Sequence, residues 1–100
     1  MTLIAEWLER HTNQAPPALR ARVTFYALHA AGPSLPLILA SAGQTALQEV
    51  LEHSGDRSAA LDLLAADALI TLALLAQAES SPDRMEELAT SVLQTSRSGA

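Results

Sequence analysis

Hydrophobic positions dominate the stretch from Ser58 to Glu79, which contains neither glycine nor proline. Placed at 100° intervals, its leucines and alanines cover one broad helical face, and Leu63, Ile70 and Leu74 form a second stripe roughly opposite. Because Ala and Leu are strong helix formers, the pattern predicts a single helix. A helix with two apolar faces must be covered on two sides, so we expect it at the centre of a bundle or at a seam between subunits.

Four other stretches show helical periodicity, and turn or capping residues separate them. Their expected ranges are about 3–11, 17–31, 34–53 and 82–94. Pro17 stands at a first helical turn, and Gly32 stands where that helix is expected to end. Gly43 either weakens its helix by about 1 kcal/mol relative to Ala or permits a close helix crossing. Trp7 is the expected anchor of the first helix on the rest of the chain.

No strand pattern and no long linker interrupts these helices. We therefore predict an all-α fold with a single domain over 1–100: a compact five-helix bundle around a central helix at about 58–79. A polar tail over 95–100 is expected to be frayed. Composition agrees, because only three residues are aromatic and Ala and Leu supply most of the apolar positions, which favours closely packed helices over a sheet.

Charge and cysteine content exclude several classes of function. All six basic residues are arginine, so neither a Schiff-base lysine nor a P-loop lysine is present. The net charge of −5 and the dispersed arginines disfavour nucleic-acid and anionic-membrane partners. The chain has no cysteine, which rules out disulfides and thiolate metal sites. No phosphate-binding loop or catalytic triad pattern occurs either, so the sequence favours a non-catalytic protein without a cofactor.

The sequence also bears on location. The opening MTLIAEWLERH lacks a basic region and a continuous apolar core, unlike a secretory signal. The uncharged run from Ala68 to Ala78 is shorter than the roughly 20 residues that cross a bilayer. Asp67 near the middle of the helix would cost on the order of 3 kcal/mol in lipid. We therefore expect a cytoplasmic protein with no membrane partner.

Apolar residues on more than one side of the second, third and central helices point to assembly. Three such helices expose more apolar surface than a 100-residue monomer can easily cover. We therefore expect a homodimer, in which part of these helices is buried between subunits. The expected interface residues on the central helix are Leu64, Leu69, Leu72 and Leu75.

Arg22, Tyr26 and His29 are spaced at i, i+4 and i+7 and so share one helical stripe. A guanidinium, a phenol and an imidazole together can bind an anionic ligand. The same spacing is also typical of an Arg and a His at the boundary of a core, with a buried Tyr between them.

Asp62 and Asp67 stand among leucines in the central helix, where a carboxylate must be paired, hydrated or protonated. Asp67 is expected to meet Arg20, Arg22 or Arg57, or its symmetry mate across a dimer seam. We count Asp67 with the candidate ligand-binding residues.

Glu49, Glu52 and His53 are spaced at i, i+3 and i+4 near the end of the third helix, and Asp56 follows at i+7. Carboxylates and an imidazole at this spacing can hold a divalent metal. The spacing matches no standard metal signature. A solvated acidic face, with His53 at a helix C-terminus, explains the pattern equally well.

Two segments resemble parts of the trans-isoprenyl diphosphate synthases. Residues 26–38, YALHAAGPSLPLI, are similar to the family's early stretch Y-A-L-x-A-G-G-K-R-L-R-P-L-L, and residues 64–73, LAADALITLA, are similar to its later L-A-G-D-A-L-L-T-L-A. Together they cover about a quarter of the chain. The family's diphosphate-binding Lys and Arg are replaced by Pro33 and Ser34, and both of its Asp-rich magnesium motifs are absent. The resemblance therefore implies an all-α fold and dimerisation but not prenyl transfer.

The sequence thus predicts a small helical protein that acts through protein–protein contacts, as a homodimer or as an accessory subunit. The alternative is a binder of a small apolar or prenyl-like ligand in a pocket between helices, with Arg22 and His29 near its mouth.

Overall fold

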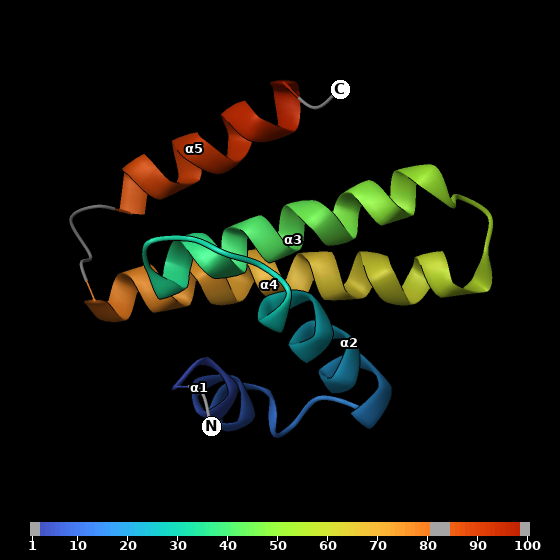
Figure 1. Ribbon diagram of the computed structural model, residues 1–100, viewed down its shortest axis with the longest axis horizontal. Coiled ribbons are helices and arrows are strands. Elements are labelled where there is room, and N and C mark those ends of the chain that lie inside the picture. Colours follow the sequence, from blue (N-terminus) through green and yellow to red (C-terminus); the bar gives the residue numbers. More distant parts are fainter. Residues whose placement is uncertain (1–2, 81–84, 99–100) are drawn as a thin grey trace.

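Two long antiparallel helices form the centre of the molecule (Figure 1). The computed structural model describes residues 3–80 and 85–98. The helices are α1 (Leu3–Thr12), α2 (Pro17–Leu28), α3 (Leu35–Glu52), α4 (Arg57–Ser80) and α5 (Met85–Ser98). The described residues contain no strand, so the predicted all-α fold is confirmed. The Cα radius of gyration, 13.0 Å, is that of a compact chain of this length.

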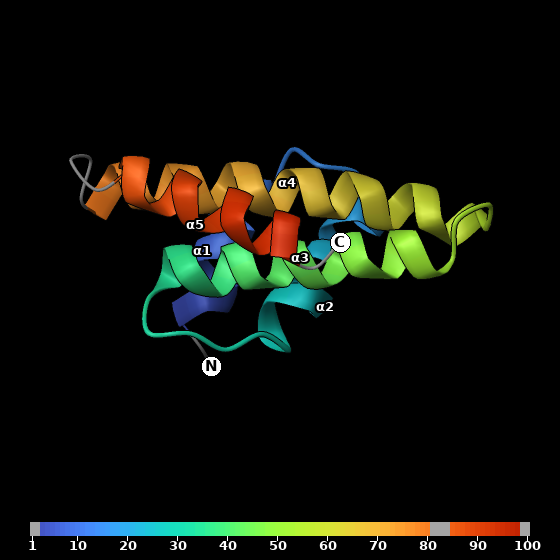
Figure 2. The same ribbon diagram turned by 90° about the horizontal axis from the view of Figure 1, so that it is seen from above.

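The α3–α4 pair separates the other helices. In Figure 1, α5 lies above the pair, whereas α1 and α2 lie below it. Seen from above, α5 runs obliquely across α4 and α3 (Figure 2). The side-chain amide of Gln44 on α3 donates a hydrogen bond of 3.1 Å to the carbonyl of Val92, which fixes α5 to α3. The central helix therefore has neighbours on two sides.

Small side chains let α3 and α4 approach closely. Ala42 and Ala46 on α3, and Ala65 and Ala73 on α4, are completely buried. A Cβ atom on Gly43 would lie only 2.8 Å from Cδ1 of Ile70 on α4. Gly43 therefore permits the close crossing that was one of its two interpretations.

Two helix C-termini lie more than one residue from those expected. The second helix ends at Leu28 rather than Ala31. The backbone N–H groups of His29 and Ala30 donate hydrogen bonds to carbonyls three residues earlier, and this tighter pattern ends the α-helix. The fifth helix continues to Ser98, so the tail expected from Thr95 is helical as far as it is described. The caps expected at Thr2 and around 81–83 lie outside the described residues.

The turn between α3 and α4 uses the conformational freedom of one glycine. Gly55 has φ of +98°, a value that residues with a side chain rarely adopt. The backbone amide of Asp56 then donates to the carbonyl of His53, and α4 begins at Arg57. This short turn sets the antiparallel pairing of the two long helices.

Among the described helices, α4 alone is long and apolar enough to cross a membrane by length and composition. Core helices of soluble proteins meet the same criterion. In this fold, 44% of the most apolar window of α4 is buried within the chain. Asp62, in its N-terminal half, is buried against α2 by an ion pair with Arg22.

Candidate functional site

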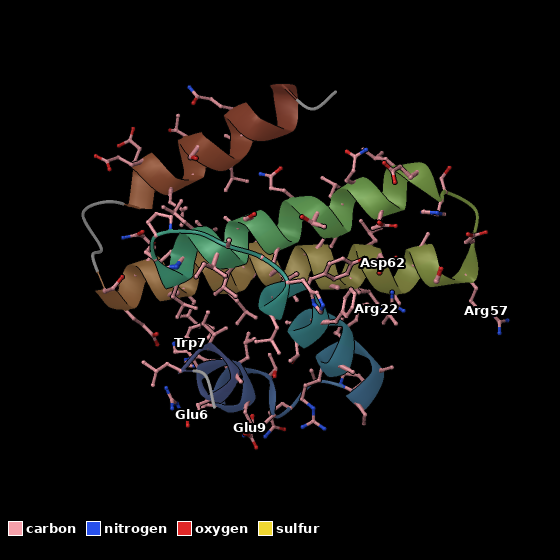
Figure 3. All side chains as sticks on the ribbon, in the orientation of Figure 1. Glu6, Trp7, Glu9, Arg22, Arg57 and Asp62 are labelled. Atoms are coloured by element: carbon pink, nitrogen blue, oxygen red, sulfur yellow. The ribbon has the colours of Figure 1, made fainter. Side chains whose placement is uncertain are left out.

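Asp62 is the one charged residue among the described residues that the fold buries. Nη1 of Arg22 and the hydroxyl of Tyr26 each donate a hydrogen bond of 2.9 Å to Oδ1 of Asp62. Arg22 and Tyr26 stand one turn apart on α2 and reach α4 together; Figure 3 labels Arg22 and Asp62. The three side chains form a polar cluster between the two helices, which we call the Asp62 cluster.

The charges of the Asp62 cluster neutralise each other within the cluster. The guanidinium neutralises the carboxylate, and no buried side-chain polar atom in the described part of the chain lacks a hydrogen-bond partner. Burial, followed by the hydrogen bond to the negatively charged Asp62, raises the pKa of the Tyr26 phenol. The phenol is therefore held in its neutral, donating form. A closed cluster of this kind orients α2 on α4 and leaves little capacity for a ligand.

Two of the expected ligand-binding residues lie apart from this cluster. His29 is exposed, and its Nδ1 contacts the carbonyl of Phe25 at 2.7 Å. Asp67 is exposed on α4 and forms no ion pair within the described residues. The expected pairing of Asp67 with Arg22 is wrong, because Arg22 pairs with Asp62 instead. The i, i+4 spacing correctly predicted that the side chains of Arg22 and Tyr26 lie close together.

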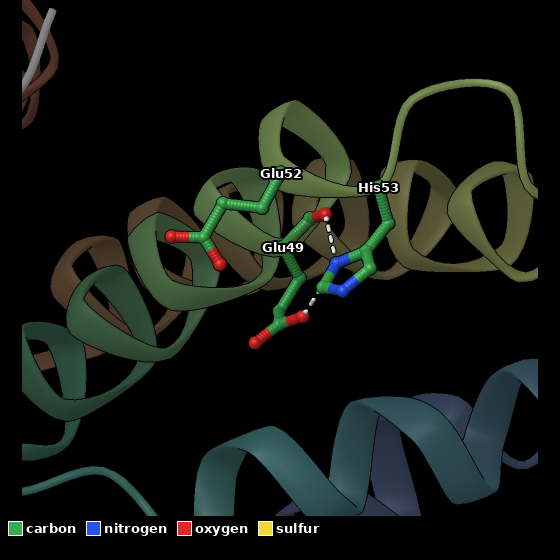
Figure 4. A group of neighbouring side chains, drawn as sticks. All are labelled: Glu49, Glu52 and His53. Atoms are coloured by element: carbon green, nitrogen blue, oxygen red, sulfur yellow. Dashed lines mark hydrogen bonds and ion pairs between the residues drawn. The ribbon is translucent and has the colours of Figure 1, made fainter.

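The candidate metal residues lie on the exposed C-terminal end of α3 (Figure 4). One potential ligand atom from each of Glu49, Glu52 and His53 falls within 4.8 Å of the others. Nδ1 of His53 lies 3.1 Å from the carbonyl oxygen of Glu49 and 3.2 Å from its Oε2. The bond to the backbone carbonyl, more than any other effect, raises the pKa of His53.

This arrangement is compatible with a charged helix end and with a metal site that uses the other ring nitrogen of His53. Both atoms that face Nδ1 of His53 are acceptors, so Nδ1 carries a proton, and Nε2 is the ring nitrogen left to bind a cation. The amide of Gln48 donates to Glu52 at 3.1 Å. Glu52 and Nδ1 of His53 thus have partners on their own helix, and the metal assignment remains a prediction.

A second polar cluster, which sequence reasoning missed in part, joins α1 to the end of α4. The indole of Trp7 and the imidazole of His11 are stacked, with ring centroids 3.9 Å apart. Both rings contact Glu79 at 3.3 Å, Trp7 through Nε1–H and His11 through Nε2. Trp7 is therefore an anchor of α1, and Glu79 is its partner on α4. Sequence periodicity gave no signal for this partner, because the contact spans more than 60 positions.

The outward side of α4 carries apolar residues that the other described helices leave wholly or partly exposed. Six residues spaced alternately four and three apart follow this side, and we call them the outer stripe: Ala60, Leu64, Asp67, Thr71, Leu74 and Ala78. Leu74 is half-buried and the other five are exposed. Leu63 and Leu75, beside the stripe, are 52% and 41% exposed. This surface has the heptad spacing of a helix–helix seam.

The expected interface residues divide between this surface and the core. Leu64 and Leu75 are 56% and 41% exposed, whereas Leu69 and Leu72 are 0% and 8% exposed. Leu69 and Leu72 are buried within their own chain, so they are not available to a second copy. The four leucines span too wide an arc of the helix to face one neighbour.

A shallow groove of about 270 Å³ lies where α3, α4 and α5 meet. Its lining is mainly apolar, with Gln44 and Asp67 as polar members. Arg22 and His29 do not line it, so the expected mouth residues of an apolar pocket are not at this groove.

No family model, curated protein or solved structure matches the chain. The resemblance to isoprenyl diphosphate synthases therefore rests on the two sequence segments alone.

Proposed function

We propose that this protein is a non-catalytic interaction module that works as a homodimer through the outer stripe of α4. The observation that supports the proposal is the apolar character of that stripe. Between Arg57 and Ser80, its only polar members are Asp67 and Thr71. Exposed apolar side chains gathered on one side of a helix are typical of an interaction site.

The polar clusters of the fold support the same proposal. The Asp62 cluster holds α2 on α4, and the contacts of Glu79 hold α1 on α4. Each cluster thus holds one helix on α4, a structural role that involves no substrate. Both clusters also lie on the buried or flanking sides of α4, which leaves the outer stripe for a partner.

The groove between α3, α4 and α5 favours a second candidate function, the binding of a small apolar ligand. Leu47, Leu63 and Ile70 supply apolar lining, and its volume of about 270 Å³ is just below the range typical of small-molecule sites. A prenyl-like chain would contact Asp67 and Gln44 there rather than Arg22. Native mass spectrometry of the purified protein tests this function, since a bound lipid would add a discrete mass that solvent extraction removes.

The solution mass of the wild-type chain tests the leading proposal. Light scattering coupled to size exclusion should return twice the chain mass of 10.5 kDa. The dimer should dissociate on dilution if the two copies fold independently. A constant mass of 10.5 kDa at the highest soluble concentration would contradict homodimerisation.

A further inference from the structure

The order of residues along the outer stripe is nearly symmetric about its middle. From the start of α4 its residues are Ala60, Leu64 and Asp67, and from the end they are Ala78, Leu74 and Thr71. The alternating spacing of four and three residues is also symmetric about position 69. In an isologous interface residue i of one copy contacts residue j of the partner, and residue j contacts residue i in return. The symmetric spacing of the outer stripe fits such an interface, because each of its layers then pairs with another layer of the same stripe.

We infer that α4 packs antiparallel against α4 of a second copy, with the two-fold axis at the level of residue 69. This inference rests on the proposed homodimer and specifies its geometry. In this register Ala60 faces the partner's Ala78, and Leu64 faces the partner's Leu74. The alanine layers at both ends allow the helix backbones to approach, and the leucine layers fill the space inside them.

Charge distinguishes this register from a parallel pairing. Parallel, in-register helices would place Asp67 against the partner's Asp67, two like charges at one layer of a seam. In the antiparallel pair, Asp67 faces the hydroxyl of the partner's Thr71. That hydroxyl now donates to the Asp67 carbonyl of its own chain at 2.9 Å, and it can turn to donate to the partner's carboxylate. The two Asp67 residues are then displaced by about 6 Å along the helix axis.

The ends of α4 are also complementary. Arg57 is exposed at the beginning of α4, and Glu79, 48% exposed at its side chain, lies near the end. In an antiparallel pair Arg57 of one copy lies at nearly the same level along the axis as the partner's Glu79, whose carboxylate also contacts Trp7 and His11 of its own chain. The helix dipoles also oppose each other in this arrangement.

Because the chain has no cysteine, introduced cysteines can report the geometry directly. Ala60→Cys and Ala78→Cys are small changes at exposed positions. The two variants should be co-expressed, with an affinity tag on one copy, and oxidised under mild conditions. Each variant should also be oxidised alone, and Ser54→Cys, exposed outside α4, serves as the control for random collisions.

The antiparallel pair predicts a disulfide between positions 60 and 78 in the mixture and little cross-linking in either variant alone, because like positions are about 27 Å apart. Efficient 60–60 or 78–78 cross-links would overturn this register. So would a dimer by light scattering that forms no cross-link above the Ser54→Cys background. Either of these results leaves the homodimer standing, whereas a monomeric mass for all variants and the wild type would overturn both proposals.

Discussion

Nη1 of Arg22 lies 2.9 Å from Oδ1 of Asp62, and this contact joins α2 to α4 across 40 positions of the chain. The Asp62 side chain is 8% exposed and that of Arg22 is 33% exposed. Removing a buried carboxylate from water is costly unless a cation and hydrogen bonds compensate it. The contact therefore fixes where α2 docks on the central helix.

Replacing Arg22 tests this role. Arg22→Met keeps the apolar stem but leaves Asp62 with Tyr26 as its only described partner. We expect a loss of about 2 kcal/mol in the free energy of unfolding, less than for a fully buried pair because Arg22 is partly exposed. Urea unfolding followed by circular dichroism measures it, with the exposed Arg10→Met as the matched control. Equal stability of the two variants would show that the ion pair does not hold α2.

Tyr26 gives the fold a dependence on alkaline pH. Its phenol has a raised pKa in the folded protein, so the unfolded chain loses this proton first as pH rises. The stabilisation is complete below pH of about 10 and is lost as pH rises through the folded-state pKa. Tyr26 is the only tyrosine, so tyrosinate absorbance reports it alone. We expect a midpoint above the ordinary value and a lower one in Asp62→Asn; a wild-type midpoint at or below the ordinary value would refute this account.

Gly43 tests the close packing of α3 on α4. Gly43→Ala should change stability by less than about 1 kcal/mol, because the gain in helix propensity offsets the displacement of the Ile70 side-chain tip. Gly43→Leu should cost about 1 to 3 kcal/mol by overpacking the crossing. Adding Ile70→Ala to Gly43→Leu should recover part of that loss, measured by urea unfolding. Additive effects of the two substitutions would argue against contact between these positions.

Helical periodicity predicted the elements because caps, prolines and glycines mark their ends locally. Periodicity did not predict which side of a helix each neighbouring helix covers, and therefore which polar residues are buried. Asp62 and Asp67 both stand among leucines, yet they point about 140° apart on α4. Only Asp62 faces α2, and that packing is decided by contacts 36 to 40 positions away.

The interface leucines show the same limit. In projection Leu64 and Leu72 belong to one apolar face, which no sequence pattern subdivides. Packing within the chain covers the part of that face that contains Leu69 and Leu72, and leaves Leu64 exposed. A charge at Leu72 would therefore disrupt the core before it could report on assembly.

The solution mass of Leu64→Glu, measured by light scattering beside the wild type, tests the central claim most directly. Leu51→Glu is the matched control, because Leu51 is 65% exposed at the end of α3, away from the outer stripe. We predict that the wild type and Leu51→Glu have twice the chain mass, whereas Leu64→Glu is a folded monomer of 10.5 kDa. A Leu64→Glu dimer with unchanged dissociation would contradict the assignment of the outer stripe as the interface.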